Sequence, residues 1–235
     1  RIARFIAKLF KSAGMLKTGQ FVECRKDDLV SQYIGGTGPK ARKKLESAVG
    51  GVFFLDEAHT LVEGEKDSWG KEALGVVMEF AETRRDDMII ILAGYTKELK
   101  ELFKRDGGMH SRFPQWVDFP DYSADDLQAI ANEILNAGGL KVDAQAGKAL
   151  KQVCHHIAVA QKRDPATGNA RAVRGSIEKM RRLLSVRVQA LAQERARSRG
   201  LDGKETFKAL TTSEMTTLTG PDAERLVAEW RGGGQ

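Results

Sequence analysis

Two adjacent carboxylates, Asp56 and Glu57, come directly after the apolar run Val52–Leu55. The short length and the bulky residues of this run predict a strand that is buried on both faces. Ligands of open parallel sheets bind beyond the carboxyl ends of the strands, so both acids would reach a binding edge. There Asp56 would face a Mg²⁺ ion, and Glu57 would orient or deprotonate a water molecule that attacks phosphorus. The alternative is that two acids merely end a strand.

Two arginines occupy positions from which a guanidinium group could contact a phosphate. Arg112 lies between a predicted helix and a predicted strand, from where it could stabilise phosphoryl charge across a subunit boundary. Arg171 comes two residues after Asn169, a predicted N-cap, so it would lie in a first helical turn, where the helix dipole disfavours a cation. A bound anion would relieve that conflict. Surface salt bridges and simple exposure to solvent are the alternatives.

An aromatic-aliphatic-glycine triplet, Tyr33-Ile34-Gly35, lies within a glycine-rich segment. On an exposed loop, such a triplet could grip a peptide by stacking and van der Waals contact without sequence selectivity, and Gly35 would allow the loop to move. The alternative is an ordinary glycine turn with a half-buried Tyr33, and the triplet by itself favours that alternative.

Histidines and cysteines give no metal signature. The pair His155-His156 lacks partners at ligand spacing, and Cys24 and Cys154 are predicted to be core thiols. Two cysteines also exclude a disulfide scaffold and a four-thiolate zinc site. The tetrapeptide Asp56–His59 spells the signature of one helicase class, but those helicases need two recA-like lobes, for which 235 residues are too few.

The segments that must position these residues alternate in the first half of the chain. Short strands are predicted at 20–24, 51–55, 88–93 and 116–119, and of these 51–55 and 88–93 are continuous apolar runs. Periodic apolar residues and flanking stop signals predict helices at 2–13, 40–49, 68–83 and 97–104. This alternation predicts an α/β fold, a parallel sheet covered by helices on both faces.

The pattern changes at Pro120, after which only helices are predicted. They cover 124–136, 144–161 and 171–199, and Ser123 with Asp126 would cap the first of them. We therefore expect an α/β domain over 1–121, a smaller all-α domain over 122–200, and a weakly patterned, frayed tail over 201–235.

The composition is that of a folded chain, with 41% hydrophobic and 30% charged residues and a net charge of +6. No stretch approaches the ~18–20 apolar residues that span a bilayer. No secretory leader is visible, although the chain starts at Arg1 rather than Met. The arginines of Ala170–Arg199 predict nucleic-acid binding only weakly, because no stacking or base-reading module accompanies them.

In their order along the chain, these motifs resemble those of the AAA+ ATPases. Within that class they are most similar to the CbbX group, the red-type Rubisco activases and their relatives of the stage V sporulation protein K type. The resemblance covers about residues 1–187. Its landmarks are Asp28–Gly35, Gly51–Ala58, Ala93–Tyr95, Ser111–Phe113, Phe119–Tyr122 and Gly168–Arg171.

The resemblance implies roles for the residues singled out above. Asp56 and Glu57 would be the Walker B pair, which binds Mg²⁺ and activates water. Arg112 would be the arginine finger, and Arg171 the sensor 2 arginine that reads the γ-phosphate from a helical lid. The triplet Tyr33-Ile34-Gly35 would be the pore loop that pulls a polypeptide through the channel of a hexamer.

The implied cofactors are ATP and Mg²⁺, and the implied partners are further copies of the chain in a ring and a protein client. Membrane association and nucleic-acid binding are not implied, and the implied compartment is cytoplasm or plastid. Where relatives carry a sensor 1 asparagine, this chain reads Ala93-Gly94-Tyr95-Thr96, so a hydroxyl of Tyr95 or Thr96 would take that role.

One departure from the family pattern is large. The Gly-x-x-x-x-Gly-Lys-Ser/Thr phosphate loop is absent from the sequence, and in the family it directly precedes the helix that Ile2–Phe5 resembles. We therefore expect a fragment of a longer ATPase, with weak or absent hydrolysis by these residues alone. The alternatives are a non-hydrolysing module that lends Arg112 to active relatives and, ranked lower, a nucleic-acid-binding protein.

Overall fold

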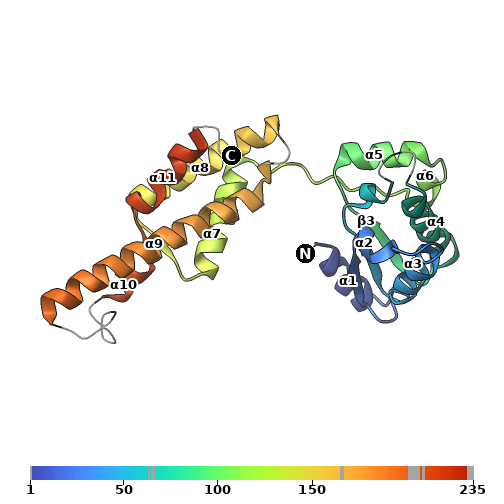
Figure 1. Ribbon diagram of the computed structural model, residues 1–235, viewed down its shortest axis with the longest axis horizontal. Coiled ribbons are helices and arrows are strands. Elements are labelled where there is room, and N and C mark those ends of the chain that lie inside the picture. Colours follow the sequence, from blue (N-terminus) through green and yellow to red (C-terminus); the bar gives the residue numbers. More distant parts are fainter. Residues whose placement is uncertain are drawn as a thin grey trace. The chain divides into compact units, whose positions relative to one another are not determined.

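The structure is a computed structural model that describes residues 2–62, 64, 67–164, 167–200, 207 and 210–231. The chain divides into two compact units, Arg1–Asp118 and Phe119–Gln235 (Figure 1). None of the described helices combines the length and the apolar character needed to cross a lipid bilayer.

A three-stranded parallel sheet lies within the first unit. Strand β2 (Val52–Leu55) is central, flanked by β1 (Phe21–Cys24) and β3 (Ile89–Leu92). The pairing is in register, so the last residues of the three strands lie side by side at one edge. The predicted parallel sheet is confirmed.

Helices flank this sheet, and the predicted ones differ from the observed ones by at most a few residues at either end. They are α1 (Ile2–Ser12), α2 (Lys26–Leu29), α3 (Thr37–Glu46), the 3₁₀ helix η1 (Ala58–Val62), α4 (Ser68–Thr83), α5 (Thr96–Arg105) and α6 (Met109–Arg112). Helix α3 begins earlier than expected because Pro39 is tolerated in a first turn, where its missing N–H is not needed.

Strand β2 is buried on both faces, as its apolar run predicts. Phe53 and Leu55 belong to the larger core, which is completed by apolar residues of α3 and α4. Val52 points to the opposite face and packs with Ala7 of α1 and with Leu16. This double burial anchors the strand end at which the two acids emerge.

The strand predicted at 116–119 is wrong. Residues 113–123 are irregular, and the described sheet ends at β3 without pairing to them. The Trp116 ring packs 4.8 Å from that of Phe103, centroid to centroid, while Val117 and Phe119 are exposed. A short apolar run becomes a strand only where a neighbouring backbone completes its hydrogen-bond ladder.

Gly70 in the first turn of α4 is required by a close approach of two backbones. A Cβ at this position would overlap the carbonyl oxygen of Leu61 in η1. We expect Gly70→Ala to lower the free energy of unfolding by about 1–3 kcal/mol, because the overlap displaces η1. The matched control is Gly75→Ala in the same helix, where a Cβ meets open space. That change should raise the free energy of unfolding by up to about 1 kcal/mol. Urea denaturation measures both, and equal effects would contradict the prediction.

The second unit contains five described helices and one small sheet. The helices are α7 (Ala124–Ala137), α8 (Ala144–Arg163), α9 (Ala170–Arg199), α10 (Thr212–Thr216) and α11 (Gly220–Arg231). Two short strands, β4 (Lys141–Val142) and β5 (Thr217–Leu218), pair in parallel. This pairing corrects the all-helical prediction, because two-residue strands carry no periodic signal in the sequence.

The long helix α9 supplies one face of the core of this unit, and α8 and α11 lie side by side (Figure 1). The predicted apolar stripe of α9 is buried at Ile177, Met180, Leu184 and Val188. The capping box at the start of α7 is confirmed, since Ser123 accepts from the Asp126 amide and Asp126 accepts from Ser123.

The described residues beyond 200 include helices and a strand, so the prediction of a frayed tail is wrong for them. Helix α11 and strand β5 bury apolar residues in the core of the second unit, among them Leu218 and Leu226. The buried carboxylate of Asp222 accepts a hydrogen bond from Nη2 of Arg187 at 2.9 Å. The predictions for 201–206, 208–209 and the final Gly-rich residues lie outside the described residues. Packing against residues far away in sequence stabilises this segment, and its local pattern does not indicate that packing.

Candidate functional site

The carboxyl edge of the sheet brings together residues that come after three different strands. The backbone ladder continues past the strands: the Asp56 amide donates to the Cys24 carbonyl at 2.9 Å, and the Ala93 amide to the Leu55 carbonyl at 2.9 Å. The Ala58 amide then donates to the Ala93 carbonyl at 2.8 Å. These bonds hold the segments after β2 and β3 against each other.

Asp56 is partly exposed and paired with a cation from the neighbouring strand. Its Oδ2 lies 3.2 Å from Nη2 of Arg25, the residue directly after β1, and the Arg25 side chain is largely exposed. An exposed pair of this kind contributes at most about 1 kcal/mol, so it can open to admit another cation. Sequence reasoning did not single out Arg25. Its place directly after a strand of the same parallel sheet is the signal that would have found it.

Glu57 adopts an unusual backbone conformation. Its φ is 51°, in the left-handed region, which costs a non-glycine residue roughly 1–3 kcal/mol. Its Oε2 is buried without a hydrogen-bond partner among the described atoms. The same atom lies 3.6 Å from Nδ1 of His59, which is also buried and unpartnered there. Strained backbone and unpaired buried polar atoms concentrate at functional sites, so Glu57 is the strongest candidate here.

The carboxylates of Asp56 and Glu57 offer oxygen atoms, the kind of ligand that suits a magnesium nucleotide. Mg²⁺ is usually held by one or two protein carboxylates together with phosphate oxygens and water. Asp56 and Glu57 supply such oxygens at the edge where ligands of parallel sheets bind. Among the described residues, no group of three or more His, Cys, Asp or Glu side chains could hold a metal by itself.

Tyr95 and Thr96 lie at the same edge, after β3. Tyr95 is the N-cap residue of α5 without a side-chain capping bond, and its ring centroid lies 6.2 Å from that of His59. Thr96 is the first residue of α5. Of the predicted site residues, Asp56, Glu57, Tyr95 and Thr96 thus all lie in the two segments that follow β2 and β3 at this edge.

Arg112 ends α6 and turns onto its own unit. Its Nη1 donates to the Gly108 carbonyl at 3.2 Å, and its Nε lies 3.5 Å from Oε2 of Glu82. The Nε atom is buried but makes no hydrogen bond within the described part of the chain. The side chain is therefore held loosely, by one long hydrogen bond and one partly exposed ion pair.

The triplet Tyr33-Ile34-Gly35 projects into solvent from the loop between α2 and α3. Tyr33 is 79% exposed and Ile34 is 94% exposed, so the alternative of a half-buried tyrosine is wrong. The loop is nevertheless ordered, because the Tyr33 amide donates to Oγ of Ser31 and the Gly36 amide donates to the Tyr33 carbonyl. Gly35 has a φ of 73°, the left-handed conformation that suits glycine.

Arg171 belongs to the second unit and is exposed in the first turn of α9. Asn169 is the N-cap residue, but its side chain does not cap the helix, contrary to expectation. Its Nδ2 donates to Oδ1 of Asp121 at 3.0 Å instead, and its amide donates to Oε1 of Gln161 at 3.0 Å. These bonds tie the helix start to the first residues of the unit and hold Asn169 at a φ of 47°.

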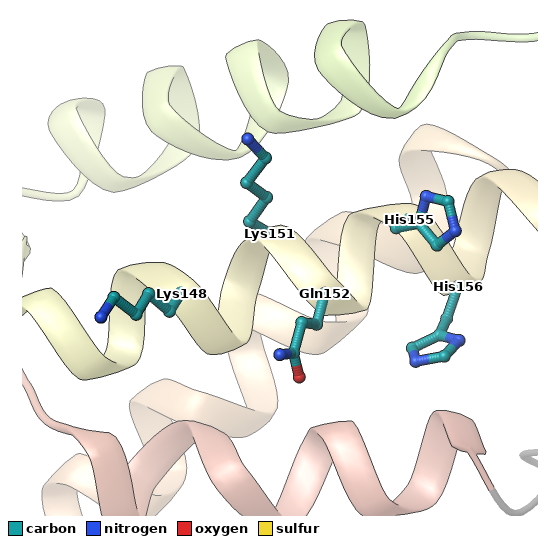
Figure 2. Close-up of a pocket in the computed structure, with 5 residues that line it drawn as sticks. All are labelled: Lys148, Lys151, Gln152, His155 and His156. Atoms are coloured by element: carbon teal, nitrogen blue, oxygen red, sulfur yellow. The ribbon is translucent and has the colours of Figure 1, made fainter.

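The remaining candidates from the sequence carry no site. His155 and His156 point to different sides of α8, as Figure 2 shows, and they line an open hollow of about 400 Å³ with Lys148, Lys151 and Gln152. Cys24 and Cys154 are buried and unpaired, as predicted. Burial raises the pKa of the Cys24 thiol to about 12 and that of the Cys154 thiol to about 11, which keeps both protonated and unreactive near neutral pH.

Known proteins resemble this chain over most of its length. The family described as "AAA lid domain" matches residues 123–230. Stage V sporulation protein K of Bacillus subtilis is 36% identical over 191 residues, which cover 81% of this chain and 57% of that protein. Protein CbbX of Cereibacter sphaeroides is 35% identical over 77% of this chain and 57% of that protein.

Two further proteins show similarity. A chloroplastic ribulose bisphosphate carboxylase/oxygenase activase of Cyanidioschyzon merolae is 34% identical over 77% of this chain and 60% of that protein. A solved structure of a RuvB mutant of Thermotoga maritima shares 13% identity at a TM-score of 0.44, over 91% of this chain and 75% of that one. The chain thus spans less than two thirds of the length of these three curated relatives.

The second unit matches the AAA lid domain, and the similarity to CbbX and stage V sporulation protein K points to the AAA+ ATPases. The chain is homologous to CbbX and stage V sporulation protein K, to which it is 35–36% identical.

Proposed function

We propose that this chain forms the water-activating edge and the lid of an AAA+ machine that hydrolyses ATP between subunits to remodel a protein client. The observation that carries the proposal is the Glu57 carboxylate, held in a strained conformation at the carboxyl edge of the sheet with one oxygen unpartnered among the described atoms. A carboxylate held in this way at a sheet edge where ligands bind suits a general base that orients water.

Each residue at the edge receives a role. Asp56 holds Mg²⁺, which neutralises charge as the phosphoryl group transfers. Glu57 orients the attacking water or accepts its proton. A hydroxyl of Tyr95 or Thr96 contributes to positioning that water. Arg112, donated by a neighbouring subunit, stabilises the charge that develops on the phosphate oxygens.

The lid contributes Arg171, which is exposed in the first turn of α9. A bound anion there would offset the unfavourable interaction of the arginine with the helix dipole. Binding ATP or ADP would stabilise different arrangements of such a ring, and the difference in affinity supplies the energy for movement. The activase name of one relative points to a carboxylase as the client of that relative. For this chain we propose a ring of identical subunits in which the exposed loop with Tyr33 and Ile34 contacts a protein client.

Hydrolysis needs a phosphate loop, which these 235 residues do not contain. The test therefore compares the chain alone with a loop-fused chain, in which a Gly-x-x-x-x-Gly-Lys-Ser/Thr strand-loop segment precedes Arg1. We expect Mg²⁺-dependent phosphate release from the loop-fused chain and little from the chain alone. Robust hydrolysis by the chain alone would contradict this assignment, as would a folded, ATP-binding fusion without hydrolysis.

Tyr33 and Ile34 should matter for the client and not for stability. Because both side chains are exposed, Tyr33→Ala should change the free energy of unfolding by less than about 0.5 kcal/mol. It should abolish the stimulation of hydrolysis by an unfolded polypeptide while basal hydrolysis of the loop-fused chain persists. Tyr122→Ala, which removes another exposed tyrosine, is the control. Stimulation that survives Tyr33→Ala and Ile34→Ala together would refute the pore-loop role.

One observation favours a second function, a module that binds active relatives without hydrolysing ATP. Arg25 pairs with Asp56 at the position proposed for the metal. If that pair persists, the Arg25→Ala loop-fused chain should hydrolyse ATP while the parent does not. Nucleic-acid binding is not favoured, because Arg187 and Arg195 of α9 form ion pairs within their own unit.

A further inference from the structure

His59 is the residue of the Asp56–His59 motif to which the proposed function assigns no role. It is the second residue of η1, just beyond the strained Glu57. Its Nδ1 lies 3.6 Å from Oε2 of Glu57, which is slightly beyond the roughly 2.7–3.2 Å range of an N–H···O hydrogen bond. Both atoms are buried, and neither has a hydrogen-bond partner among the described atoms.

The surroundings of the His59 ring explain why it lies there. A Cβ on Gly94 would come within 2.8 Å of the His59 Nδ1 atom, so a residue with a side chain at 94 would push the ring away. The Tyr95 ring lies nearby, with 6.2 Å between the two ring centroids. The Ala58 amide bonds the Ala93 carbonyl and joins the two segments that carry these residues. The imidazole thus occupies a space that only glycine at 94 leaves open.

We propose that His59 is a positioning residue whose Nδ1–H donates to Oε2 of Glu57 and holds the carboxylate in the orientation that activates water. Two buried polar atoms at this separation lack other partners among the described atoms, and a small closure of the pair satisfies both. A neutral imidazole with its proton on Nδ1 is such a donor. One carboxylate oxygen is then fixed by His59, and the other is left to face the attacking water. The hydrogen bond stands on geometry, whereas its effect on hydrolysis rests on the proposed function.

The hydrogen bond is tested on the chain itself by NMR of the imidazole nitrogens. We expect His59 to carry its proton on Nδ1, and Glu57→Gln to shift both ring nitrogen signals, while the signals of His155 stay unchanged. His59→Asn identifies the resonance by its loss. An Nδ1 atom without a proton in the parent chain, or ring nitrogen signals that do not change with Glu57→Gln, would overturn the proposal.

The effect on hydrolysis is tested in the loop-fused chain. His59→Leu should lower kcat by about 10- to 100-fold with little change in KM, because the change misplaces the carboxylate and leaves nucleotide binding intact. His59→Asn keeps an N–H donor near the place of Nδ1 and should recover most of kcat. Gly94→Ala should resemble His59→Leu, and His155→Leu on the exposed face of α8 is the control.

These outcomes separate the two proposals. If Glu57→Gln leaves kcat unchanged, the proposed function fails whatever His59 does. If Glu57→Gln abolishes hydrolysis but His59→Leu and His59→Asn behave alike, only the positioning role fails. A loss of kcat with His59→Leu that persists at equal size in the Glu57→Gln background would also refute it, since His59 would then act without Glu57.

Discussion

Glu57→Gln is expected to reduce ATP hydrolysis by the loop-fused chain at least about 100-fold while ATP stays bound. The amide keeps the size of the side chain but cannot accept a proton from water. The backbone conformation, with a φ of 51°, is retained because both residues carry the same strain. Single-turnover phosphate release and retention of labelled ATP measure the two effects separately.

The matched control for Glu57→Gln is Glu101→Gln in α5, which removes an exposed carboxylate paired with Lys104. This control should leave hydrolysis within about twofold, because exposed pairs contribute little. If Glu57→Gln also stays within that range, water activation at this edge is refuted, and the role of the paired acids has to be reassigned.

Arg112→Ala is expected to lower hydrolysis about 1,000-fold, the size of effect seen when an arginine that stabilises phosphoryl charge is removed. The contacts of the side chain within its own unit are weak enough to allow the proposed donation to a neighbour. It is bound to its own unit only by a 3.2 Å hydrogen bond to the Gly108 carbonyl and by a partly exposed contact with Glu82, as far as the described residues go. Steady-state hydrolysis by the loop-fused chain measures the loss, with Arg85→Ala as the control for an exposed arginine.

Mixing two inactive variants decides whether Arg112 acts across a subunit boundary. In a ring that contains both Arg112→Ala and Glu57→Gln subunits, some interfaces combine an intact Glu57 with an intact Arg112. Hydrolysis should therefore recover in part when the two proteins are mixed. No recovery in rings shown to contain both variants would place the action of Arg112 within its own subunit.

The strands, the acids and most helix bounds were predictable because their signals are local. A continuous apolar run such as Val52–Leu55 is buried inside a sheet, and the residues directly after it emerge at a sheet edge. Ser123 with Asp126 marks a helix start through bonds within one turn. In the same way, a loop at Tyr33 and Ile34 was predictable because glycines interrupt the pattern around them, whereas the exposure of Tyr33 was not, since the triplet by itself favoured a half-buried tyrosine.

Errors occurred where the outcome depends on a distant partner. The run at 116–119 has the composition of a strand, yet the described sheet offers it no neighbouring backbone. The tail carries only weak patterning, yet α11 is held by burial against α8 and by Asp222, whose partner Arg187 lies 35 residues earlier. The sequence predicts that the side chain of Asn169 caps α9, but that side chain donates a hydrogen bond to Asp121 instead.

The sequence by itself determined that a buried strand delivers Asp56 and Glu57 to the carboxyl edge of a parallel sheet, since hydrophobic burial and the direction of a parallel strand are encoded in adjacent residues. Only the tertiary structure decided that Arg25 pairs with Asp56, that Glu57 is strained, and that His59 lies beside it where Gly94 leaves room. The Arg25–Asp56 pair and the approach of Gly94 to His59 join segments that follow different strands, so these distances depend on how the strands align in space.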